Sequence, residues 1–262
     1  IASGGNYNVL IGDEAGTAIT TGDNNSVLGF EALKTNSTTS NNTALGYQAL
    51  KVNVADLNTA VGSSSLIANT SGALNVAVGA FALNANTTAS SNTAVGYASL
   101  EENTEGGSNT AIGFKTLEAQ TTASYNTAVG SNAGMSIVDG AVNTIIGALS
   151  GDAITTGDYN TTLGVSTLGA NTASNKNTAI GGNSLVNFNV TTDTDTYNTT
   201  VGYGAGQVVS TGVNNTLIGA LAGDALTDAD HNVAVGRGSL GADTLGSKTV
   251  AIGFGALSSQ DF

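Results

Sequence analysis

Residue types that commonly carry out catalysis are scarce in this chain. It has no cysteine and one histidine, His231, which lies directly before Asn232. Metal sites and activated nucleophiles are usually built from cysteines, several histidines, or a histidine beside a hydroxyl group. We therefore interpret His231 as a surface turn residue and predict neither an enzyme nor a bound cofactor. Surface carboxylate pairs that cleave polysaccharides are the catalytic alternative.

Two carboxylates alternate with threonine near residue 195, in the segment Asp193-Thr194-Asp195-Thr196-Tyr197. Ca²⁺ prefers oxygen ligands, so Asp193 and Asp195 are candidate metal ligands. The segment lacks the glycine and the distal glutamate of an EF-hand loop. We favour an exposed loop that contacts a receptor, with a calcium site as the alternative.

Tyrosine recurs immediately before an asparagine that itself recurs along the chain. A row of tyrosines can stack on sugar rings and so bind a glycan. Aromatic rows more often pack on one another or contact another chain, and we favour that interpretation. The candidate binding residues are Tyr7, Tyr125, Tyr159 and Tyr197.

A five-residue motif, Asn-[Thr/Ser/Val]-x-[Val/Ile/Leu]-Gly, organises nearly the whole chain. Fourteen copies end at glycines between Gly12 and Gly236, and a fifteenth has Thr249 in place of the asparagine. Successive motif glycines are 17 residues apart, except for one interval of 16 residues and one of 21. So regular a spacing indicates a stack of equivalent structural units.

The copies compensate one another in volume. The fourth residue after the motif glycine is Leu in ten copies and Gly in five. After Leu, the residue three positions further on is Asn, Gln or Asp in nine of ten copies; after Gly it is always aliphatic, as with Gly151 and Ile154. One bulky apolar group per copy therefore fills one space in a close-packed interior. The exception, Leu185 with Phe188, lies in the 21-residue copy.

These features predict an all-β fold, a parallel β-solenoid (β-roll) of about 15 coils with a 17-residue repeat. A unit this short must bury its face against its neighbours. Stacked strands would then align identical residues, and the motif asparagines can stack amide on amide at a tight corner. We expect one continuous repeat domain over residues 1–262 without obvious caps, cut from a longer fibre or stacking end to end on other copies.

Two adjacent strand positions are both apolar. The residue before the motif glycine is always aliphatic, and the residue before that is apolar in thirteen of fifteen copies, mostly alanine. Strand side chains alternate, so these two columns face opposite ways, and a strand that is apolar on both faces is normally covered on both. We expect a homo-oligomer, with the aliphatic column inside each chain and the alanine column at a shared axis.

Threonine occupies the second motif position in ten copies. Regular threonine arrays occur in ice-binding solenoids, usually as two outward threonine columns. Here the partner column is the aliphatic one, which we place inside the coil. Ice binding is therefore the third interpretation, behind a fibre and a filament.

Two strings carry a resemblance to known proteins: Asn42 to Leu50 reads N-T-A-L-G-Y-Q-A-L, and Asn92 to Leu100 reads N-T-A-V-G-Y-A-S-L. They resemble repeats of phage tail fibres and are similar to head repeats of trimeric autotransporter adhesins, although the adhesin repeat is shorter. The resemblance covers essentially the whole chain and implies a left-handed, trimeric β-roll. It also implies an extracellular structural or adhesive shaft, on a virion tail fibre or a cell surface, that contacts a host glycan or protein receptor.

Charge limits the partners further. The net charge is −13, and only six residues are Lys or Arg. No basic patch is present to neutralise phosphates, so nucleic acid is not an expected partner. No apolar run has the length needed for membrane insertion. The expected partner is the chain itself, as a homotrimer, and the alternative is a subunit of an extracellular filament that polymerises head to tail.

Overall fold

Residues 4–259 are described by a computed structural model, and they form an all-β parallel β-solenoid of about 14 turns with a spacing of about 17 residues. The predicted fold class is confirmed. Contacts group the chain into two compact units, unit 1 (Ile1–Asn126) and unit 2 (Thr127–Phe262). The left hand of the coil, the trimer and the single continuous domain stay predictions.

Each turn contributes one three-residue strand, formed by the motif residues between the asparagine and the glycine. In unit 1 these strands are β1 (Val9–Ile11), β2 (Ser26–Leu28), β3 (Thr43–Leu45), β4 (Thr59–Val61), β5 (Val76–Val78), β6 (Thr93–Val95) and β7 (Thr110–Ile112). In unit 2 they are β8 (Thr127–Val129), β9 (Thr144–Ile146), β10 (Thr161–Leu163), β12 (Thr178–Ile180), β14 (Thr199–Val201), β15 (Thr216–Ile218), β16 (Val233–Val235) and β17 (Val250–Ile252).

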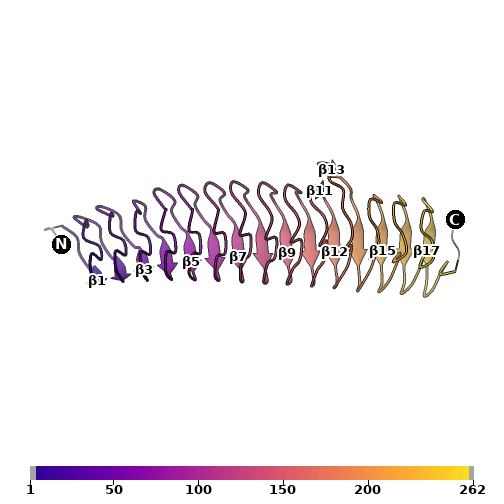
Figure 1. Ribbon diagram of the computed structural model, residues 1–262, viewed down its shortest axis with the longest axis horizontal. Helices are drawn as coiled ribbons and strands as arrows, with labels where there is room; N and C mark the ends of the chain where they lie inside the picture. The colour runs from indigo at the N-terminus through magenta and orange to yellow at the C-terminus, as the bar shows by residue number, and fades with distance from the viewer. Residues whose placement is uncertain (1–3, 260–262) are drawn as a thin grey trace. The chain divides into compact units, whose positions relative to one another are not determined.

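Within each unit, strands that follow one another in this order are parallel neighbours (Figure 1). Equivalent motif positions pair, as Thr93 does with Thr110 in unit 1. The 16-residue interval keeps this register, because Thr43 pairs with Thr59, and the 21-residue interval keeps it because Thr178 pairs with Thr199. The extra or missing residues are therefore absorbed outside the strands.

The motif glycine is required by both backbone conformation and close packing. Gly96 has φ 137°, a conformation that residues with a Cβ rarely adopt. A Cβ built on Gly96 would lie 2.1 Å from the carbonyl oxygen of Gly113 in the next turn. The motif glycines therefore let successive turns stack backbone on backbone.

The interior of each turn contains the middle residue of the strand, which corrects one expectation. From β2 to β17 the middle residue of every main-sheet strand is buried, and the alanines from Ala44 to Ala234 in this column have no exposed surface. The alanine column therefore does not lie at a shared axis. A narrow coil closes around small side chains, and the neighbouring aliphatic column points outward because strand side chains alternate.

The motif asparagines form the predicted ladder inside the coil. The backbone N–H of Asn109 donates to Oδ1 of Asn92 at 2.9 Å, and Nδ2 of Asn92 donates to the Gly106 carbonyl oxygen at 2.9 Å. Both side chains are buried, and the same arrangement recurs in turns of both units. Each buried amide thus satisfies backbone groups at a corner that would otherwise lack partners.

The predicted volume compensation is confirmed as well. Leu100 is fully buried in a turn of the leucine type, and Ile154 is fully buried in a turn of the glycine type. A Cβ built on Gly151 would lie 2.9 Å from Cδ1 of Ile154. The glycine therefore leaves the space that the isoleucine fills.

The 21-residue interval adds a second, two-stranded parallel sheet in unit 2. It pairs β11 (Ser174–Asn175) with β13 (Thr194–Asp195). Figure 1 shows β11 and β13 on the limb of the coil away from the main-sheet strands. The inserted residues therefore extend one limb and leave the main strands undisturbed.

Candidate functional site

The first and third residues of the main-sheet strands make a partly exposed surface in each unit, which we call the outer strand face. None of these residues is buried, whereas from β2 to β17 the middle residue between them is. Ile112 is 39% exposed in unit 1, and Leu163 is 46% exposed in unit 2. The third residues are aliphatic throughout, and most of the first residues are threonine.

Charge is absent from the outer strand face. No Asp, Glu, Lys, Arg or His occupies the first or third position of any main-sheet strand in residues 4–259. The chain nevertheless has 19 acidic residues, and none of those in residues 4–259 stands at a first or third position of a main-sheet strand. Contiguous exposed apolar surface of this kind usually marks an interaction site.

Aromatic residues border this face, just after the motif glycine. The rings of Tyr97 and Phe114 stack with centroids 5.6 Å apart and an interplanar angle of 14°, and Phe30 and Tyr47 stack in the same way. Each ring of a pair covers one face of its partner, and all four residues stay partly exposed. Four of the aromatic residues that follow a motif glycine therefore pack ring on ring as two pairs.

The four predicted binding tyrosines do not form a row. Tyr7, Tyr125, Tyr159 and Tyr197 are each more than half exposed and adopt positive φ just before the motif asparagine. They belong to separate turns, and other residue types, such as Val142 between Tyr125 and Tyr159, occupy the same position in the turns between them. They are therefore isolated rings on the surface of their units.

Asp193 and Asp195 lie together on the exposed insertion, and each has a carboxylate oxygen that already has a partner. Lys176 Nζ lies 2.5 Å from Asp195 Oδ2, which also accepts a hydrogen bond from the Tyr197 hydroxyl at 2.9 Å. Asn175 Nδ2 donates to Asp193 Oδ1 at 2.7 Å. The bond from the Lys176 ammonium holds the pKa of the Asp195 carboxyl below its usual value. The geometry is that of a polar cluster that pins the insertion to the preceding turn.

The remaining chemical features are few. His231 is exposed at the corner before Asn232, as predicted for a turn residue. Residues 4–259 contain no group of three His, Cys, Asp or Glu side chains placed to hold a metal ion. Over the same range, no helix has the length and apolar character needed to cross a membrane.

Sequence reasoning missed which face of the strand points outward, although one signal was present. In the five turns with glycine at the fourth position after the motif glycine, the middle strand residue is usually larger than alanine, as with Leu217 before Gly223. A Cβ on Gly223 would lie 2.8 Å from Leu217 Cδ2. This covariation places the middle strand residue in the same interior as the fourth position.

Comparison of the chain with protein-family models, with curated proteins and with solved structures gives no match.

Proposed function

We propose that this chain is a structural or adhesive fibre segment, part of a phage tail fibre or a cell-surface adhesin shaft, which assembles outside the cell as a homotrimer. The observation that carries the proposal is the charge-free outer strand face. It supports packing of copies side by side, because the interior of each turn is already filled and this face stays partly exposed without charge.

The outer strand face is close in area to one side of a standard protein interface. Strands lie about 4.8 Å apart and rise about 3.3 Å per residue, so the main-sheet strands of the two units offer roughly 700 Å². A standard protein interface buries about 800 Å² on each partner. In the proposed trimer the outer strand faces meet at the shared axis, and the acidic limbs point into solvent.

The mechanism of such a segment is geometric. Each turn repeats the same asparagine and backbone hydrogen bonds, so length grows with copy number while the buried contacts per turn stay constant. The exposed insertion at β13 and the corner tyrosines then provide local points for contact with a receptor. No catalytic step is proposed, and hydrolysis of a panel of polysaccharides would contradict this part of the proposal.

The test is the absolute mass in solution, measured by light scattering after size exclusion. A mass near three times 25.6 kDa is expected. A clean monomer would overturn the trimer. A broad distribution of very large species would instead favour the alternative, a filament subunit that polymerises head to tail.

A second candidate, ice binding, gains support from one observation. The aliphatic column was expected inside the coil, but it shares the exposed face with the threonine column. Both columns of the array therefore point outward. From β6 to β15 the first strand residue is threonine in every main-sheet strand. Lattice-shaped ice growth in the presence of a monomeric protein would favour this candidate over the fibre.

A further inference from the structure

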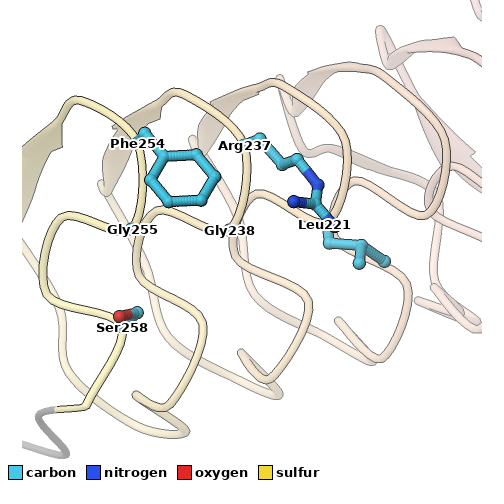
Figure 2. Close-up of a pocket in the computed structure, with 6 residues that line it drawn as sticks. All are labelled: Leu221, Arg237, Gly238, Phe254, Gly255 and Ser258. Atoms are coloured by element: carbon cyan, nitrogen blue, oxygen red, sulfur yellow. The ribbon is translucent and has the colours of Figure 1, made fainter.

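A hollow of about 260 Å³ lies beside the last turns of unit 2, at the border of the outer strand face. Its lining residues are Leu221, Arg237, Gly238, Phe254, Gly255 and Ser258. Figure 2 shows these residues in three successive turns, with the Phe254 ring and the Arg237 side chain on one side and Ser258 below them. The three turns are those that follow β15, β16 and β17.

The hollow exists because two glycines replace side chains. Gly238 and Gly255 occupy the second position after the motif glycine, where Lys115 and Leu149 stand in other turns. A Cβ built on Gly238 would meet no atom within 4 Å. The floor is therefore backbone, and its N–H groups already donate to the Ala220 and Arg237 carbonyl oxygens.

Arg237 is the one arginine of an acidic chain, and its side chain has no ion pair or hydrogen bond within residues 4–259. Lys34, Lys51, Lys115 and Lys176 are all paired with carboxylates. The Arg237 guanidinium lies 5.9 Å from the centroid of the Phe254 ring. Packed beside a ring in this way, a guanidinium keeps N–H donors free for a planar acceptor such as a carboxylate.

We propose that this hollow binds a carboxylate-bearing sugar residue, a hexuronic acid of an acidic glycan. Arg237 N–H groups donate to the sugar carboxylate, the Phe254 ring packs against the apolar face of the sugar, and the Ser258 hydroxyl lies within the same hollow. The volume is below the roughly 300 Å³ at which pockets for drug-sized ligands begin, which fits a single sugar residue. This inference deepens the adhesive role proposed above and rests on it for its biological setting.

Saturation-transfer NMR on the whole chain tests the proposal with methyl glucuronide as the probe. Methyl glucoside lacks the carboxylate, and acetate lacks the ring. We expect saturation transfer from the protein to methyl glucuronide and at least tenfold less transfer to methyl glucoside. Equimolar acetate should not displace methyl glucuronide. Equal transfer to both sugars would overturn the carboxylate contact, and displacement by acetate would overturn the contact with Phe254.

Two variants locate the binding. Arg237→Gln removes the guanidinium and should reduce transfer at least tenfold. Gly238→Asn should do the same by filling the hollow; asparagine is tolerated there because Asn132 and Asn183 hold the same repeat position with φ 58° and 56°. Full transfer in both variants would place the binding elsewhere and overturn the proposal.

The matched control is Lys248→Gln, which removes an exposed cation that has no ion pair among the described residues and does not line the hollow. Lys248→Gln should leave saturation transfer to methyl glucuronide unchanged. A loss equal to that in Arg237→Gln would show that binding depends only on net charge, and this result would overturn the proposed site. The mass of each variant, measured by light scattering, distinguishes failure of the trimer from failure of the sugar site. A native monomer that binds methyl glucuronide would overturn the trimer alone, and a trimer that does not bind would overturn this site alone.

Discussion

Leucine at the fourth position after the motif glycine adopts a backbone conformation that few leucines adopt. Leu100 is fully buried with φ 51°, and the equivalent leucines in both units have similar values. A β-branched residue in this left-handed region is a steric outlier. Ile137 and Ile154 fill the same interior space from a position without positive φ. Backbone strain therefore explains why the interior group is leucine at one position and mostly isoleucine or valine at the other.

We expect Leu100→Ile to lower the free energy of unfolding by about 2 kcal/mol, because the isoleucine must adopt a left-handed conformation. The matched exchange, Ile154→Leu, keeps the volume without positive φ and should cost less than about 1.5 kcal/mol. Urea unfolding followed by circular dichroism measures both values. Equal costs for the two exchanges would contradict the assignment of strain to the leucine position.

Asp243 stands where other turns place asparagine, and it is fully buried. Its Oδ1 accepts the Gly246 N–H at 2.7 Å, but its Oδ2 has no hydrogen-bond partner among the described residues. In the equivalent place, Nδ2 of Asn103 donates to the Gly106 carbonyl oxygen at 3.0 Å. A carboxylate cannot make this second bond because it has no donor.

Asp243→Asn should therefore stabilise unit 2 by about 1–3 kcal/mol, since a buried polar atom without a partner is replaced by a donor that can reach the Gly246 carbonyl oxygen. The reverse exchange, Asn103→Asp, should destabilise unit 1 by a similar amount. Thermal unfolding of both variants at pH 7 checks the pair. A destabilised Asp243→Asn variant would mean that the carboxylate has a partner that the static structure does not contain.

At the scale of the element, most of the fold could be predicted because each strand is fixed by a local motif. The glycine spacing located every main-sheet strand, and the register survived the 16- and 21-residue intervals. The prediction of which strand face lies inside the coil was wrong. Alternation places the two columns on opposite faces of the strand but does not say which of them is inside. The hollow at Gly238 and the isolation of the four tyrosines could not be predicted, because they depend on which residues stand in neighbouring turns.

A cluster of charges ties the first turns of unit 1 together. Glu31 accepts hydrogen bonds from Lys34 at 2.7 Å and from Gln48 at 2.7 Å, and it lies 2.6 Å from Lys51. Lys34 also pairs with Glu14 of the preceding turn. Hydrogen bonds from Lys34, Lys51 and Gln48 lower the pKa of Glu31 from 4.5 to about 2.

This shift predicts how stability depends on pH. Because the folded-state pKa is lowered, Glu31 contributes stability that is fully present above pH 4.5 and is lost as the pH falls towards 2. Glu31→Gln should reduce the fall of the unfolding temperature over that window. Glu102→Gln, which removes an exposed carboxylate without an ion pair among the described residues, should leave the fall unchanged. Identical pH profiles for the native chain and Glu31→Gln would show that the cluster does not couple to folding.

At the scale of the whole molecule, the distribution of charge matters more than its total. A chain with a net charge of −13 repels its own copies over most of its surface. The outer strand face is free of charge in every turn of both units within residues 4–259. Association is therefore least opposed where this face meets the same face of another copy, which leaves the acidic surfaces in solvent.

Val95, the third residue of β6, tests this conclusion at the level of assembly. Val95→Lys would bring three ammonium groups together at the axis of the proposed trimer, where like charges repel and lose water. The side chain points out of its own coil, so the turn itself should stay folded. We expect the mass in light scattering to fall towards 25.6 kDa with an unchanged circular dichroism spectrum.

The matched control for this substitution is Val54→Lys. Val54 is 54% exposed in the same unit but does not belong to the outer strand face, so the variant should keep the native mass. If both variants dissociate, added positive charge of any kind disrupts the assembly. If neither does, the copies meet on another surface. Loss of the assembly in Val95→Lys alone would locate the contact on the outer strand face, because the two exchanges add the same side chain and differ only in where they place it.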